Sequence, residues 1–301
     1  DDVTLKTKTE TTHTCNEKTE SSQSNQHKVG HNKDTNVIFE SISKSSKDLL
    51  TWHHKLNHMH MKTLQDLSRH GFLPSHLATC QIPRCSACQL GKQRKLTSNT
   101  KDNHIANKDI TKPGDLVSTD QVESSTPGRP LTYSGHNSEH KIKAVTIFVD
   151  TVSKKVFCEF QTSTNADETI QGKLAMEREA NKFNAKIKTI RADNGIFKSA
   201  KFREHINELE QNITFCGVSA HHQNGIAERH IQTLVKITRT SLLNAHARWP
   251  EAIDMELWTF AFQHAVDQWN SSPKRELQYR TSDEVFSGLT SRQNSKNTTF
   301  Q

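Results

Sequence analysis

AVTIFVD, at residues 144–150, is an unbroken apolar run that ends in a carboxylate. A continuous run of this length is typical of a strand that is buried on both faces of a sheet. KKVFCEFQTS follows at residues 154–163 and alternates around Val156, Cys158 and Phe160, so it pairs with the first run as a hairpin. The two segments therefore predict the centre of a sheet.

Further elements lie on both sides of this hairpin. DLVSTDQVE, at 115–123, reads as a strand that carries acids, and a Gly/Pro/Ser-rich insertion over 121–142 separates it from the hairpin. Downstream, helical and extended patterns alternate, with helices at 166–183, 198–209, 224–245 and 250–270 and strands at 186–195 and 213–219. Three strands in a meander followed by alternating units indicate an α/β domain with a mixed five-stranded sheet flanked by helices.

Three carboxylates fall where such a sheet presents ligands. Asp120 lies in the first strand, Asp193 ends the fourth in IRADNG, and Glu228 lies in the first turns of the long helix, in HHQNGIAERHIQTL (221–234). Converging carboxylates repel one another unless a cation neutralises them, and oxygen ligands suit Mg²⁺ or Mn²⁺ better than Zn²⁺. The sequence therefore predicts a two-metal site for in-line phosphoryl displacement.

Simpler structural roles are possible for Glu228 and for two other acids, Asp150 and Glu159. Glu228 could simply favour the positive end of its helix dipole, an effect worth about 1 kcal/mol or less. That effect explains neither the spacing to Asp193 nor the Asn224-Gly225 turn before the helix. Asp150 reads as a turn residue and Glu159 as a surface residue, although both end or punctuate strands.

A second candidate site lies at residues 48–97. Cys85-Ser-Ala-Cys88 is a tight turn of the kind that places two thiolates on one Zn²⁺. The other two ligands come from His53 and His58, or from His54 and His58 at i and i+4. On an unbroken helix His53 and His58 would diverge, but Asn57 can take the left-handed conformation and turn the chain before His58, so His53 and His58 are the preferred pair.

This module reads as helical. Asp48 can cap a short helix that carries Leu49, and a second helix fits Met61–Ser68 with Gly71 as its stop. Cys80 is the weaker candidate for a metal ligand. A core this small is typically held by a metal or disulfides, which favours the zinc reading over an accidental Cys pair.

Composition bounds the rest of the chain of 301 residues, which is 32% hydrophobic. Residues 1–47 are polar and predict a disordered linker with a short strand at 37–42, and residues 291–301 predict a disordered tail. A net charge of +7 and a pI near 9.0 favour a polyanionic partner. No apolar run is long enough for a membrane span, and no signal peptide is expected. The first residue is Asp, which indicates a piece of a longer chain.

These motifs together resemble the integrases of long-terminal-repeat retrotransposons, specifically the copia type. LVSTDQ, IRADNG, HHQNGIAER and, at 269–288, WNSSP…YRTSDEVFSG carry the resemblance to the catalytic core. WHHKLNH and CSAC resemble the pre-integrase zinc module, although Asn57 stands where the family usually has Gly. The resemblance covers roughly residues 48–290. It implies a zinc module over 48–97, with His53, His58, Cys85 and Cys88 as ligands, followed by a ribonuclease H-like core over 108–290.

The resemblance also implies an activity. The family trims the 3′ ends of the element's DNA and joins them to target DNA, with Asp120, Asp193 and Glu228 holding two Mg²⁺ or Mn²⁺ ions. It implies a Gag-Pol polyprotein origin, double-stranded DNA partners (element ends and target), no membrane partner and self-association. Integration would take place in the nucleus, after a stage in a cytoplasmic particle. Contacts to DNA are expected from Asn224, Arg229, Lys236 and Arg239.

Two other functions compete with this one. A catalytically silent nucleic-acid-binding remnant or domesticated copy would keep the zinc module and the basic surface, but the intact acid triad counts against it. Ribonuclease H proper shares the fold and the chemistry, but the zinc module and the QNGIAER helix count against it. For Arg229, Lys236 and Arg239 the alternative to DNA contacts is a solvated helix face.

Overall fold

The computed structural model describes residues 5–6, 43–92, 110–131, 140–193, 195–215 and 225–290. The chain divides into two compact units: the sheet unit, residues 1–6, 53–59 and 85–301, and the helical unit, residues 7–52 and 60–84. The strand expected at 37–42 lies outside the described residues. None of the helices in the described ranges is long and apolar enough to cross a lipid bilayer.

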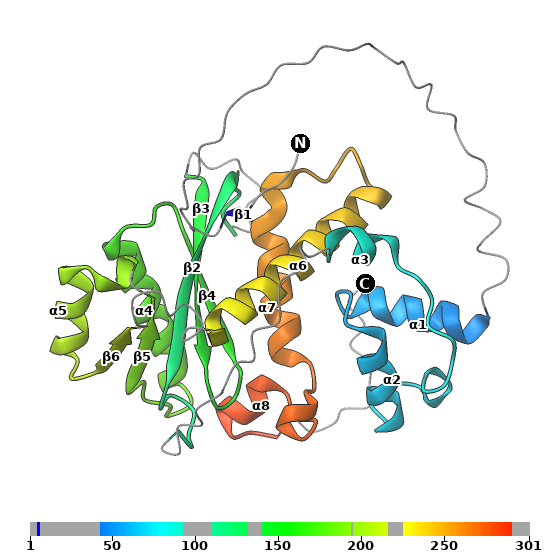
Figure 1. Ribbon diagram of the computed structural model, residues 1–301, viewed down its shortest axis with the longest axis horizontal. Helices are drawn as coiled ribbons and strands as arrows, with labels where there is room; N and C mark the ends of the chain where they lie inside the picture. The colour runs from blue at the N-terminus through cyan, green and yellow to red at the C-terminus, as the bar shows by residue number, and fades with distance from the viewer. Residues whose placement is uncertain are drawn as a thin grey trace, which may run out of the picture. The chain divides into compact units, whose positions relative to one another are not determined.

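The sheet unit alternates strands and helices in the predicted order (Figure 1). Its strands are β1 (Leu5–Lys6), β2 (Val117–Gly128), β3 (Ile142–Asp150), β4 (Val156–Gln161), β5 (Thr189–Ala192) and β6 (Asn212–Phe215). Its helices are α3 (Ser86–Gly91), α4 (Ala166–Asn181), α5 (Ala200–Glu208), α6 (Gly225–Arg248), α7 (Trp258–Ser271) and α8 (Ser282–Ser287). The helical unit holds α2 (Met61–Arg69), and α1 (Lys44–Lys55) contributes residues to both units.

The strand order confirms the predicted ribonuclease H-like sheet. The order is β4-β3-β2-β5-β6, in which β2, β3 and β4 form an antiparallel meander and β5 and β6 are parallel to β2. β1 is a two-residue addition that pairs with β2 at Glu123 and Ser124. It lies in the stretch expected to be a linker, where the composition gave no sign of a strand.

An apolar core covers each face of the sheet. Phe148 of β3 is fully buried in one core, which includes Phe202 of α5. The preceding residue, Ile147, joins the other core with Leu234 of α6 and Phe262 of α7. Successive strand residues point to opposite faces, so burial on both faces explains why AVTIFVD has no polar alternation. Figure 1 shows α4 and α5 on one side of the sheet and α6 and α7 on the other.

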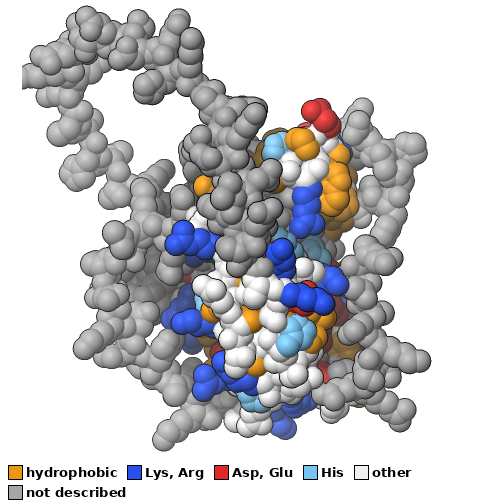
Figure 2. Space-filling view, turned by 90° about the vertical axis from the view of Figure 1, so that its right-hand side faces the viewer, with side chains coloured by type: hydrophobic (Ala, Val, Ile, Leu, Met, Phe, Trp, Pro, Cys, Tyr) orange, Lys and Arg blue, Asp and Glu red, His pale blue; other side chains and the backbone are white. Residues whose placement is uncertain are grey.

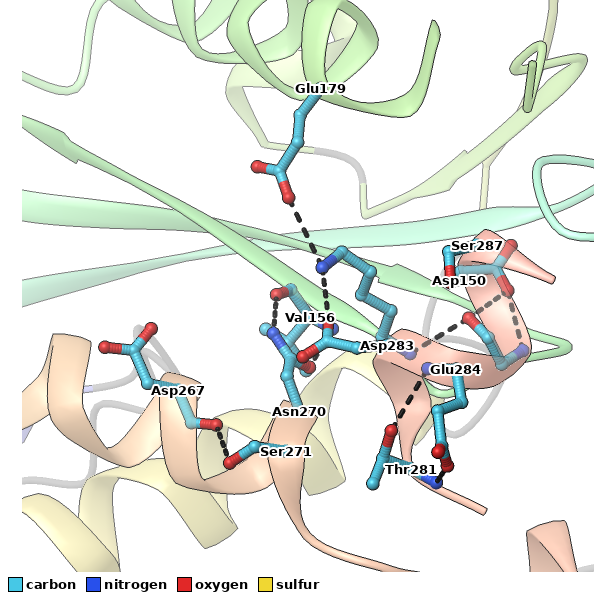
Figure 3. A network of polar contacts seen from close by, with 12 residues as sticks. Asp150, Val156, Glu179, Asp267, Asn270, Ser271, Thr281, Asp283, Glu284 and Ser287 are labelled. Carbon is cyan, nitrogen blue, oxygen red and sulfur yellow. Dashed lines mark hydrogen bonds and ion pairs between the residues drawn. The ribbon is translucent and has the colours of Figure 1, made fainter. Parts of the chain in front are cut away.

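Polar contacts attach the C-terminal helices to the start of β4 (Figure 3). The Asn270 amide of α7 accepts a hydrogen bond from the backbone N–H of Val156 at 2.9 Å and donates one to its carbonyl at 2.7 Å. The Lys155 amine contacts the carboxylates of Asp283 at 2.5 Å and Glu179 at 3.3 Å. Asn270 thus satisfies edge groups of β4, and Lys155 links α4 to α8.

The helix expected over 250–270 begins later, at Trp258. The Arg129 guanidinium contacts the carboxylates of Asp254 and Glu256, and the Arg129 backbone N–H donates to the Glu256 carbonyl at 2.9 Å. Asp254 is held in an extended conformation, φ −110° and ψ 169°. A contact from a residue 125 positions away therefore sets the helix start.

The insertion expected over 121–142 is partly strand, because β2 continues to Gly128. The Trp258 indole N–H donates to the Thr126 carbonyl at 2.9 Å. A Cβ on Gly128 would lie 2.6 Å from Trp258 Nε1, so only glycine lets the strand pass this close to α7. Residues 132–139 lie outside the described part of the chain.

Asp150 is the structural residue that the sequence predicts. It is fully buried, and its carboxylate accepts hydrogen bonds from the Gly114 backbone N–H at 2.8 Å and from the Ser153 N–H and hydroxyl at 2.7 Å each. A carboxylate used in this way closes the β3–β4 turn and is not available for catalysis.

Glu159 was expected at the surface, and this is wrong. Its side chain is half-buried against α4, where a Cβ on Gly172 would lie 3.0 Å from Glu159 Cβ. Burial raises the pKa of Glu159 to about 7, and the positive charge of Arg178 opposes the rise. The alternating pattern of β4 could not reveal this, because α4 covers the outward position.

Replacing Glu159 with Gln is expected to remove a pH dependence of stability. Between about pH 4.5 and pH 7 the folded state keeps a proton that the unfolded chain has released, so the unfolding free energy falls as the pH rises. Glutamine cannot ionise, so this loss is absent from the variant. From pH 5 to pH 8 the unfolding free energy of the variant, relative to that of the original chain, should rise by about 1–2 kcal/mol. Urea unfolding at both pH values measures this. Glu204→Gln, an exposed acid of α5, should gain nothing.

The helical unit has a small apolar core of its own. Leu49, Leu64 and Leu77 are completely buried. The Ser68 hydroxyl donates to the Pro74 carbonyl at 2.7 Å and holds the loop that follows α2. Gly71 has φ +81°, as expected of the residue that stops this helix.

Asp48 is not the cap that the sequence predicts. α1 begins at Lys44, and the Ser43 hydroxyl accepts the backbone N–H of Ser46 at 3.2 Å in the capping position. Asp48 lies inside the helix, where its carboxylate contacts His76 Nε2 at 3.2 Å. Ser and Asp are equally good caps, so only the structure chooses between them.

Candidate active site and metal centre

The face of the sheet to which Asp120 points follows from its neighbours in β2. Val117 belongs to the core under α4 and α5, and Val122 belongs to the core under α6 and α7. Asp120 is two residues from Val122, so its side chain points to the α6 face. The backbone N–H of Gln121 donates to Asp120 Oδ1 at 2.8 Å and fixes the orientation of the carboxylate.

The register of β5 brings Asp193 beside Asp120. Val117 pairs with Ile190 and Ser118 pairs with Arg191, so continuing the parallel register by two residues sets Asp120 opposite Asp193. Asp193 directly follows β5, and the Gly195 backbone N–H donates to its Oδ1 at 3.0 Å. Parallel strands end at one edge of a sheet, which makes this edge the natural place for ligands.

Glu228 reaches the same face from α6. It lies in the first turn of the helix, and α6 packs against β2 and β3 through Ile231 and Leu234. Ala227 beside it is fully buried, whereas Glu228 itself is half-buried. The helix thus carries an acid at the boundary between its buried and exposed sides.

The charges of Asp193 and Glu228 both act on the carboxyl group of Asp120. Burial, opposed by the hydrogen bond from Gln121 and aided by the negative charges of Asp193 and Glu228, raises the pKa of Asp120 to about 7. A carboxyl group under such repulsion gains by binding a cation. The oxygen-only donor set fits Mg²⁺ or Mn²⁺.

Three basic residues with a predicted role in DNA binding follow Glu228 along α6. Arg229 and Arg239 are exposed and Lys236 is half-buried. Arg229 and Lys236 are seven residues apart, so they share one side of the helix. Asn224 lies outside the described residues, and contacts of these four positions with DNA stay a prediction.

The predicted His/Cys residues come together in the sheet unit. The potential ligand atoms of His53, His58, Cys85 and Cys88 all lie within 4.8 Å of one another. Of the two His pairs considered from the sequence, the group therefore contains the preferred one, His53 and His58. Among the described residues this is the only set of three or more possible ligands gathered so closely.

The distances match a tetrahedral zinc site. His53 Nε2 lies 3.2 Å from His58 Nδ1 and 3.2 Å from Cys88 Sγ, and His58 Nδ1 lies 3.5 Å from Cys85 Sγ and 3.6 Å from Cys88 Sγ. Zinc bonds of about 2.0–2.1 Å to nitrogen and about 2.3 Å to sulfur imply tetrahedral edges of roughly 3.4 Å between nitrogens and roughly 3.6 Å between nitrogen and sulfur. The four residues therefore fit zinc without rearrangement.

Backbone conformation explains how two diverging histidines meet. Asn57 and His58 both have positive φ, 50° and 59°, so the chain turns at the end of α1. The turn brings His58 back toward His53, as the sequence predicts for Asn57. His53 Nδ1 bonds the Met59 carbonyl at 2.7 Å, which leaves Nε2 for a metal.

Sequence reasoning missed the way in which α6 supports this group. The Ser241 hydroxyl donates to the Asn57 side-chain oxygen. A Cβ on Gly91 would lie 3.0 Å from Thr240 Cα, so α3 approaches α6 through a glycine. The Lys92 amine donates to the His58 carbonyl at 2.6 Å. Gly91 was the only available sign of this packing.

The structure is that of a ribonuclease H-like α/β domain that carries a His₂Cys₂ group. Residues 18–93 match the family model of the GAG-pre-integrase domain. This range includes all four residues of the His/Cys group and overlaps residues 48–97, where the pre-integrase module is expected. No curated protein sequence matches the chain significantly.

Two solved structures are reported among those to which the chain is similar. The HTLV-2 integrase catalytic core domain in complex with magnesium, in its trimeric form, is 18% identical over 58% of this chain and 97% of that one, with a TM-score of 0.41. The simian T-cell lymphotropic virus intasome is 18% identical over 67% of this chain and 63% of that one, with a TM-score of 0.46.

Proposed function

We propose that this chain is a retrotransposon integrase of the copia type, a polyprotein segment that processes DNA 3′ ends and joins them to target DNA. The convergence of Asp120, Asp193 and Glu228 supports it most directly. These acids come from a central strand, the end of its parallel neighbour and the first turn of α6. Neither an apolar nor a structural role explains why two further carboxylates, Asp193 and Glu228, lie close enough to the buried Asp120 to raise its pKa.

The pre-integrase match supplies independent support. The module is recognised in residues 18–93, whereas the acids lie in the sheet domain that follows. Figure 2 shows more Lys and Arg than Asp and Glu side chains among the described residues of the face that it presents. A basic surface suits a polyanion such as double-stranded DNA.

The residues of this chain have separate roles in the proposed reaction. Two divalent cations, when bound, would stabilise the attacking and leaving oxygens of an in-line displacement. Asp120 and Asp193 are oriented for such ions by the backbone N–H groups of Gln121 and Gly195. Glu228 completes the set from α6, and Arg229 and Lys236 would hold the DNA backbone beside it. The reaction needs no covalent bond to the protein.

Strand transfer tests the proposal. The purified chain is mixed with a short duplex, a supercoiled target and Mg²⁺ or Mn²⁺, and joined products are resolved on a gel. We expect metal-dependent joining and an assembly larger than a monomer by light scattering with DNA bound. Binding of DNA without nicking or joining would favour a silent nucleic-acid-binding protein. Cleavage of an RNA–DNA hybrid without joining would favour ribonuclease H.

A further inference from the structure

His54 lies beside the four-residue metal group without belonging to it. Its Nε2 is 3.7 Å from Cys85 Sγ, and its ring centroid is 5.1 Å from that of His58. The four tetrahedral positions are filled by other side chains. His54 Nε2 is therefore placed to donate an N–H···S hydrogen bond to Cys85 and not to bind the metal itself.

Arg248 determines which nitrogen of His54 carries the proton. Its Nη2 lies 3.2 Å from His54 Nδ1. A guanidinium group only donates, so His54 Nδ1 accepts and the neutral ring carries its hydrogen on Nε2. That hydrogen points at Cys85. The contacts form a directed chain from Arg248 through His54 to the Cys85 thiolate.

Two histidine nitrogens lie close to the Cys85 sulfur, His54 Nε2 at 3.7 Å and His58 Nδ1 at 3.5 Å. His58 belongs to the metal group and His54 does not, so the N–H···S contact to Cys85 comes from His54. Donors around a ligand sulfur fix its direction and tune its strength as a ligand.

Arg248 is also the last residue of α6, the helix that carries Glu228 in its first turn. Ser241 and Thr240 of the same helix contact Asn57 and Gly91 beside the metal group. The last three turns of α6 therefore lie against the His/Cys group. A continuous helix of this length spans roughly 30 Å from Glu228 to Arg248.

We propose that Arg248 and His54 are positioning residues of the zinc centre, holding the Cys85 thiolate toward the metal and fastening the end of α6 to the centre. The proposal rests on the proposed function, with its pre-integrase module, and on zinc as the metal of the His/Cys group. It goes beyond them because it gives the helix of Glu228 a role in metal binding. Removal of zinc then loosens the C-terminal turns of α6.

Cobalt substitution tests the positioning role in the full chain. In His54→Phe, which keeps a ring but no donor, we expect about a 10- to 100-fold loss of zinc affinity and a shifted thiolate-to-cobalt charge-transfer band. The ligand-field bands should not change, because the two nitrogen and two sulfur ligands remain. His54→Gln, whose amide replaces the Nε2 donor, should restore most of the affinity.

Variants of Arg248 test whether its contact with His54 matters in addition to the His54 ring itself. Arg248→Gln should shift the same band by a smaller amount, and Arg248→Lys should recover part of the shift. Arg203→Gln, an exposed arginine of α5, is the matched control and should shift nothing. Hydrogen exchange before and after zinc removal should show faster exchange over 240–248 than over α5, and this difference should shrink in Arg248→Gln.

Three results would overturn the proposal. Changed ligand-field bands in His54→Phe would make His54 a ligand itself. Unchanged affinity and charge transfer in that variant, with normal zinc binding by the original chain, would make the contact incidental. Failure of the original chain to bind zinc or cobalt would remove the zinc assignment together with the proposal, while strand transfer would still test the proposed activity separately.

Discussion

Asp193→Asn is expected to reduce strand transfer by about 10³-fold or more, because a cation clamp supplies several kcal/mol and each 1.36 kcal/mol is a factor of ten in rate. The amide keeps the shape of the carboxylate and can still accept the hydrogen bond that the Gly195 N–H donates to Asp193 Oδ1 at 3.0 Å. It loses only the charge. DNA binding should therefore persist while joining disappears.

The fold should survive this substitution. The charges of Asp193 and Glu228 raise the pKa of Asp120, so removing one of them relieves repulsion. We expect an equal or slightly higher melting temperature without metal. Asp267→Asn, an exposed carboxylate of α7, serves as the matched control and should join DNA normally. Normal joining by Asp193→Asn would refute the triad.

The sheet could be predicted because its signals are local. An unbroken apolar run and an alternating run define β3 and β4, and their neighbours follow from composition and turn residues. Element boundaries depend on contacts between distant residues. Arg129 delays the start of α7 through Asp254 and Glu256, and no window of sequence around residue 250 contains that information.

Burial of single polar side chains was harder to predict. Glu159 faces outward in the pattern of β4, but α4 covers it and raises its pKa to about 7. Asp150 and Glu159 both lie at or near the ends of strands in the sequence. In the structure Asp150 accepts three hydrogen bonds, whereas Glu159 is half-buried against α4. What covers each strand is a property of the whole fold.

The candidate sites were predictable in residue type and less so in their surroundings. The positions of the acids followed from strand ends, and the parallel register of β5 explains why Asp120 and Asp193 meet. The preference for His53 over His54 depended on a turn at Asn57, and the positive φ angles of Asn57 and His58 supply that turn. The contacts from α6 to the His/Cys group join residues up to 194 positions apart.

Cys88→Ser is expected to abolish stoichiometric zinc binding and to destabilise the chain strongly. Serine does not ionise near neutral pH, so the variant loses one of the thiolate ligands that zinc requires. Binding to structural zinc sites supplies apparent free energies of about 10–16 kcal/mol in small peptides, and part of this is folding free energy. In a chain whose other elements have their own cores, we expect a loss of about 3 kcal/mol or more, which lowers the melting temperature by roughly 10 °C.

Cys80→Ser distinguishes loss of a ligand from loss of a thiol. The Cys80 thiol donates to the Leu77 carbonyl at 3.4 Å and does not belong to the metal group, so this variant should keep its zinc and its melting temperature. Metal content by mass spectrometry and thermal unfolding with and without chelator measure both properties. Zinc retained by Cys88→Ser, or lost by Cys80→Ser, would require another ligand set. We expect chelation to lower the melting temperature of the original chain to that of Cys88→Ser and to leave that of the variant unchanged. Because the chelator removes the metal and leaves the sulfur in place, this result would show that the stabilisation comes from the metal and not from packing of the sulfur.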